Sequence, residues 1–84
     1  MGMWAAETRQ YKIALMYLEA ADSKRPNEPS ILNNLAMVRY KLGDLRGAEK
    51  AIRRARDLNP ESREIQDNVK RITEAGRARS RAEK

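Results

Sequence analysis

The chain has 84 residues, enough for one small domain, and it contains neither Cys nor His. These two absences exclude disulfides and thiolate metal sites, and they remove the commonest general base and metal ligand. Charged residues make up 36% of the chain and aromatic residues 5%, which suits a helical protein with a solvated surface, and the net charge of +6 arises within residues 29–84.

The N-terminal part of the chain predicts a short helix and then a longer one. Residues Met1–Thr8 form the short helical stub in this interpretation. Residues Tyr11–Lys24 form the second helix, with Ala14 and Leu18 facing inward at helical spacing. Pro26 follows shortly afterwards, and because proline disfavours a helical residue before it, the helix ends there.

The middle of the chain predicts a helical hairpin. Residues Pro29–Leu42 carry a broad apolar stripe at helical spacing, and a proline is tolerated in a first helical turn. Gly43 and Asp44 then break the helix, since glycine readily adopts the left-handed conformation found at helix ends. The second helix, Leu45–Leu58, has small and large apolar residues on its inward face: Ala48, Ile52 and Ala55.

The C-terminal part predicts one more helix and a tail. Residues Ser62–Ala75 place Ile65, Val69 and Ile72 on one face. Residues 76–84 are basic and polar and lack periodicity, so we expect a disordered tail.

The chain repeats itself with a period of 34 residues. Small apolar residues then align with small ones, large with large, and the prolines coincide. The aligned pairs are Ala14 with Ala48, Leu18 with Ile52, Ala21 with Ala55, and Pro26 with Pro60.

These residues resemble the tetratricopeptide repeat, a unit of two helices with small residues where the helices cross. Residues 29–62 match the unit best, through Ala36, the Gly43–Asp44 turn and Pro60. The resemblance implies an all-α fold of antiparallel helix hairpins with about four helices. It divides residues 1–75 into a truncated first unit (1–28), a complete unit (29–62) and a capping helix (63–75), followed by the tail (76–84).

The resemblance also implies a concave groove, lined by the first helices of successive units, that binds a partner peptide or helix. The adjacent asparagines Asn33 and Asn34 either bracket a peptide backbone, or are simply tolerated on an exposed face, or bond to a neighbouring helix. The implied groove residues are Asn33, Asn34, Met37, Tyr40 and Lys41, with Glu64, Asp67, Asn68 and Arg71 from the closing helix.

Two other functions remain open at this point. A truncated first unit leaves apolar surface that favours a homodimer, through Met1, Met3, Trp4, Tyr11, Leu15 and Leu18. The cluster of arginines in Leu45–Leu58 would suit a basic nucleic-acid adaptor, although no aromatic residues accompany it for base stacking.

Catalysis is not indicated, because the chain has no phosphate-binding loop, no serine beside a base and no paired carboxylates. We therefore expect a scaffold that binds proteins, with no cofactor and no metal.

No apolar run is long enough to cross a membrane. The string Leu32–Ala36 resembles bacterial members of the family that assist pilus and secretion assembly. The compartment stays open: cytoplasm is favoured, and the periplasm is the alternative if the parent protein carries a signal peptide.

Overall fold

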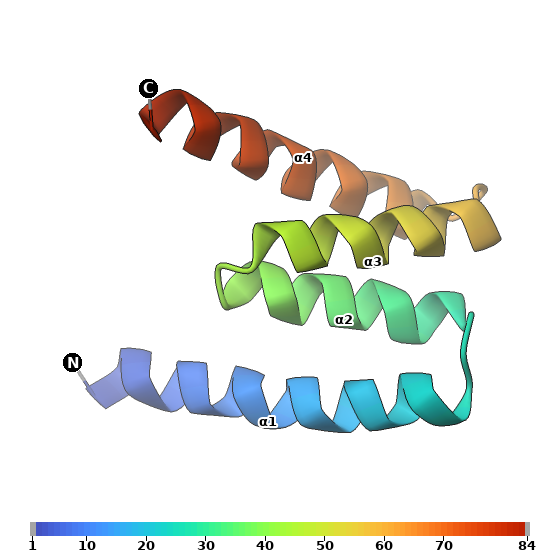
Figure 1. Ribbon diagram of the computed structural model, residues 1–84, viewed down its shortest axis with the longest axis horizontal. Helices are drawn as coiled ribbons and strands as arrows, with labels where there is room; N and C mark the ends of the chain where they lie inside the picture. The colour runs from blue at the N-terminus through green and yellow to red at the C-terminus, as the bar shows by residue number, and fades with distance from the viewer. Residues whose placement is uncertain (1, 84) are drawn as a thin grey trace.

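Four α-helices follow one another in an antiparallel array (Figure 1). They are α1 (Gly2–Lys24), α2 (Pro29–Lys41), α3 (Leu45–Leu58) and α4 (Arg63–Glu83). The computed structural model describes the backbone of residues 2–83 and the side chains of residues 7–79, and within that part it contains no strand. The predicted all-α architecture is therefore confirmed. None of these helices is both long and apolar enough to cross a membrane.

The ends of the central hairpin follow from local chemistry. Pro29 begins α2 after an extended Glu28. Gly43 adopts a φ of +87°, which only glycine reaches without strain, and so turns the chain out of α2. The Asp44 carboxylate then accepts a hydrogen bond of 3.1 Å from the Gly47 N–H, which satisfies one of the free donors at the start of α3.

The core lies where α2, α3 and α4 meet. Three alanines, Ala36, Ala48 and Ala55, are fully buried and let the helix backbones approach closely. Larger apolar residues fill the space around them; these are Leu32, Leu35, Ile52, Ile65 and Ile72. The small and large positions predicted from the 34-residue repeat are therefore core positions in α3, and of their equivalents in α1 Leu18 packs against this core.

The sequence predicted a separate helical stub at the N-terminus. Instead, residues 2–8 are the first two turns of α1. The physical reason is the lack of a stop signal between Thr8 and Tyr11. The intervening Arg9 and Gln10 both favour a helix, so nothing interrupts the backbone hydrogen bonds. The side chains of Met1, Met3 and Trp4 lie outside the described part of the chain.

The sequence predicted that the last helix ends near Ala75. Instead, α4 continues to Glu83. Gly76 weakens a helix without stopping it, because it is followed by Arg and Ala residues that favour helix. The Arg79 side chain also ties this extension to the rest of the molecule, since its Nη1 donates a hydrogen bond of 3.2 Å to the carbonyl of Gly43. The segment predicted as a disordered tail is therefore helical as far as residue 83.

Candidate partner-binding surface

A hydrogen-bonded bridge of three polar side chains joins α2 to α4. Asn68 Nδ2 donates to Asn33 Oδ1 over 2.8 Å, and Asn33 Nδ2 donates to Glu64 Oε1 over 3.5 Å. Asn33 is 6% exposed and Asn68 8% exposed, so the shorter bond is shielded from water. Because an unpaired amide in such a place is costly, this bridge holds the two helices at one distance and in one register.

The bridge corrects the expectation that Asn33 and Asn68 are exposed groove residues. Both amides are buried and directed at each other, which is the neighbouring-helix bond that the sequence analysis kept as its alternative. Periodicity could not decide this, because an asparagine beside an apolar stripe occurs on exposed and on buried faces alike. Asn34, the next residue along α2, is exposed.

The remaining predicted groove residues surround the bridge. Helical spacing from Asn33 places Met37, Tyr40 and Lys41 on the same side of α2. Met37 and Tyr40 are half-buried, and Lys41 is exposed with its Nζ 5.9 Å from the centre of the Tyr40 ring. On α4 the exposed members are Glu64, Asp67 and Arg71. Glu64 lies four residues before Asn68 and Arg71 three residues after it, on the same side of the helix, and Asp67 is the neighbour of Asn68 in the sequence.

We call this set the α2–α4 face: Asn34, Met37, Tyr40, Lys41, Glu64, Asp67 and Arg71. It combines partly covered apolar groups with cations and anions that water reaches. Side chains of this kind can bind a peptide but do not hold a reacting group in a fixed, desolvated position. Among residues 7–79 no cluster of three or more His, Cys, Asp or Glu side chains is placed to hold a metal ion.

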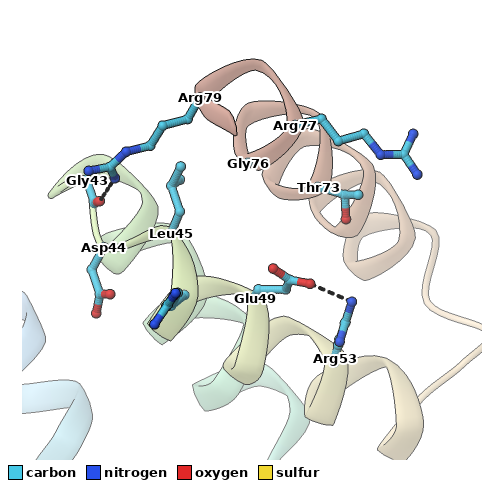
Figure 2. A pocket seen from close by; sticks show the side chains of 10 residues that line it. Gly43, Asp44, Leu45, Glu49, Arg53, Thr73, Gly76, Arg77 and Arg79 are labelled. Carbon is cyan, nitrogen blue, oxygen red and sulfur yellow. Dashed lines mark hydrogen bonds and ion pairs between the residues drawn. The ribbon is translucent and has the colours of Figure 1, made fainter. Parts of the chain in front are cut away.

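A concave feature, which we call the basic groove, lies between α3 and α4. Its main part is an open hollow of about 1010 Å³, beginning at Gly43 and Asp44 and running under Thr73, Gly76 and Arg79 (Figure 2). The residues that line this hollow and a smaller one beside it include six basic and three acidic ones. The basic ones are Arg46, Arg53, Arg56, Lys70, Arg77 and Arg79; the acidic ones are Asp44, Glu49 and Glu74.

Two of these arginines already have partners within the chain. Arg53 pairs with Glu49 one turn earlier in α3, at 2.5 Å, and Arg79 caps the carbonyl of Gly43 (Figure 2). The Arg77 side chain extends away from Glu49 and toward solvent in the same view. The arginines of α3 were visible in the sequence but the groove was not, because Arg77 and Arg79 line it only since α4 continues past Gly76.

The residues predicted for self-association are only partly uncovered. Tyr11, Leu15 and Leu18 are half-buried, and the two leucines pack against the core. Among the described residues of α1, the large apolar side chains that are exposed are different ones: Ile13 at 48%, Met16 at 71% and Tyr17 at 75%. Their spacing at i, i+3 and i+4 was visible in the sequence and marks a second apolar face of α1.

Comparison with protein-family models matches residues 5–72 to the model described as Tetratricopeptide repeat. This match covers α2 and α3 completely, most of α1, and α4 as far as the buried Ile72. Comparison with curated proteins finds no significant match. The solved structures likewise contain no significant match.

Proposed function

This chain belongs to the tetratricopeptide repeat family, whose repeats are protein–protein interaction modules, and we propose that it binds a partner peptide or helix across its α2–α4 face. The observation that supports this surface is the buried Asn33–Asn68 bond. It fixes α2 against α4, so the side chains beside it are presented on a rigid base. Less conformational freedom is then lost on binding, which favours affinity.

The side chains of the face indicate the chemistry of the partner. Met37 and Tyr40 offer adaptable apolar contact with one hydroxyl, which suits an apolar residue of a peptide. Lys41 and Arg71 can pair with carboxylates, while Glu64 and Asp67 can pair with amines or guanidinium groups. The partner we expect is therefore a segment with an apolar anchor flanked by charges of both signs.

A peptide-display library provides the test, because it requires no knowledge of the natural partner. Selected peptides are titrated against the wild-type chain and against Lys41→Glu and Arg71→Glu, with fluorescence polarisation as the measurement. We expect each variant to weaken binding by about fivefold or more, from the loss of one exposed ion pair and the repulsion that replaces it. Both residues are exposed, so the helix content should not change.

The matched controls reverse an exposed positive charge on α3 instead, in Lys50→Glu and Arg54→Glu. If these controls weaken binding while Lys41→Glu and Arg71→Glu do not, the α2–α4 face is not the binding surface.

The excess of basic residues in the basic groove favours a second candidate surface, which would take an acidic segment. Arg46→Glu and Arg77→Glu test it in the same titrations. Loss of binding in these two variants alone would assign the partner to the basic groove.

Titration with a labelled RNA or DNA at several salt concentrations tests the nucleic-acid alternative. We extend the proposal to a role in pilus or secretion assembly, which the identity of the partner would test.

A further inference from the structure

The two ends of this helical array differ in a way that the α2–α4 face does not explain. At the C-terminal end, α4 repeats α2 with polar replacements. Gln66 stands where α2 has the buried Leu32, and Lys70 stands where α2 has the buried Ala36; both are exposed. The outer surface of α4 therefore needs no further cover, as is typical of a terminal repeat.

The N-terminal end carries apolar residues instead. Tyr17 is 75% exposed, whereas Ala51, its equivalent in α3 after one repeat, is 4% exposed within the core. Among the described residues, α1 packs against α2 alone, through the side that carries Leu15 and Leu18. The opposite side presents Ile13, Met16, Tyr17 and Ala20 to solvent, and we call these four residues the α1 strip.

Two charges on one edge of the α1 strip indicate what covers it. Lys12 lies four residues before Met16 and Glu19 three residues after it, so helical spacing puts both on the same edge. Both side chains are exposed. Neither has an opposite charge three or four residues away along α1, so neither can form the usual ion pair within the helix.

We propose that the α1 strip binds the α1 strip of a second copy of this chain, with the two α1 helices antiparallel. A two-fold axis between Leu15 and Met16 brings residue 12 of one copy level with residue 19 of the other. The same edge of each helix meets across such an axis, so each Lys12 faces a Glu19 and both pairs form. Ile13, Met16 and Tyr17 are buried between the helices near the axis.

The parallel arrangement is disfavoured by the same two residues. Two parallel helices related by a two-fold axis bring opposite edges together, so the edge that carries Lys12 and Glu19 would face the other edge of the second α1 and neither ion pair would form. The six charges of α1 follow the antiparallel pattern throughout. Reversing the helix about the point between Leu15 and Met16 also brings Glu7 level with Lys24 and Arg9 level with Asp22. The proposal does not depend on the α2–α4 face, which lies on other helices.

Sedimentation equilibrium over a concentration series up to about 1 mM gives the first test. We expect the wild-type chain to approach twice the monomer mass and Met16→Glu to remain monomeric, because two carboxylates would meet near the axis. Met16 is 71% exposed, so circular dichroism should show the same helix content in both. Wild-type chain that stays monomeric throughout overturns the proposal and leaves the strip to a helix of another protein.

A charge exchange gives the second test, and it holds even if Met16→Glu fails to fold. Lys12→Glu alone and Glu19→Lys alone should each raise the dimer dissociation constant by about tenfold, since both ion pairs become repulsive. The double variant should return to the wild-type value, and so should an equal mixture of the two single variants.

The control for net charge is Lys50→Glu on α3, which should leave dimerisation unchanged. Single variants that dimerise as well as the wild type contradict the antiparallel pairing. A double variant that dimerises no more tightly than the single variants also contradicts the antiparallel pairing.

Discussion

Asn33 and Asn68 form a pair in which each buried amide depends on the other. We expect Asn68→Ala to lower the free energy of unfolding by about 1 to 3 kcal/mol, because Asn33 keeps a buried polar group without its closest partner. Replacing both by leucine should cost less than about 1 kcal/mol, since no polar group is then stranded. Urea denaturation followed by circular dichroism measures the free energy of unfolding of the wild-type chain and of both variants.

The control for this pair is the neighbouring exposed residue. Asn34→Ala should change the free energy of unfolding by less than about 0.5 kcal/mol. If Asn68→Ala is equally harmless, the bond between the asparagines contributes nothing to stability. The same result would remove the rigid base that we propose for the α2–α4 face.

At the scale of the helices, two glycines with different roles give opposite predictions. Gly76 lies inside α4 with nothing within 4 Å of an added Cβ, so Gly76→Ala should stabilise the protein by about 0.5 to 1 kcal/mol. Gly43 also has open space, but its φ is +87°, and Gly43→Ala should destabilise by about 1 to 2 kcal/mol. Thermal melts measure both, and a stabilising Gly43→Ala would contradict the left-handed turn after α2.

The second prediction for the helices concerns the alanines at which α3 crosses its neighbours. Ala48 and Ala55 are fully buried in α3, so leucine at either position should overpack the core and cost about 1 to 3 kcal/mol. The matched control is Ala78→Leu on the exposed side of α4, which should change stability by less than about 0.5 kcal/mol. Unchanged melting temperatures for both core variants would mean that α3 does not cross its neighbours at these alanines.

The helices show what sequence reasoning captures and where it stops. The α2–α3 hairpin was predictable because Pro29, Gly43 and Asp44 are local signals, and because the repeat shows which positions pack. The continuity of α1 through residues 8–11 and the end of α4 were not. No local signal decides the first, and Gly76 is a weak stop that a distant contact to Gly43 can overcome. The sequence left the bond of Asn33 to a neighbouring helix as one alternative and could not select it, because it depends on residues 31 or more positions away.

At the scale of the whole molecule, stability is distributed unevenly along the array. Each helix depends on its neighbours, and α1 has only α2, whereas α2 packs against α1, α3 and α4. In arrays of this kind a terminal element can open while the rest stays folded. The molecule measures 36 × 29 × 18 Å, so no second layer of helices covers the exposed side of α1 within the described residues.

Native-state hydrogen exchange should therefore rank the helices, with amides of α1 exchanging faster than those of α2 and α3. The difference should depend on concentration if two copies pair through the α1 strip. Raising the concentration above the dimer dissociation constant should then slow exchange in α1 and leave α4 unchanged, because α4 lies at the other end of the array. The Met16→Glu variant is the control, and its α1 should exchange at one rate at every concentration. Equal exchange in α1 and α3 at all concentrations would show instead that the chain opens as a single unit. An exchange rate in α1 that does not change with concentration would show that α1 gains nothing from a second copy.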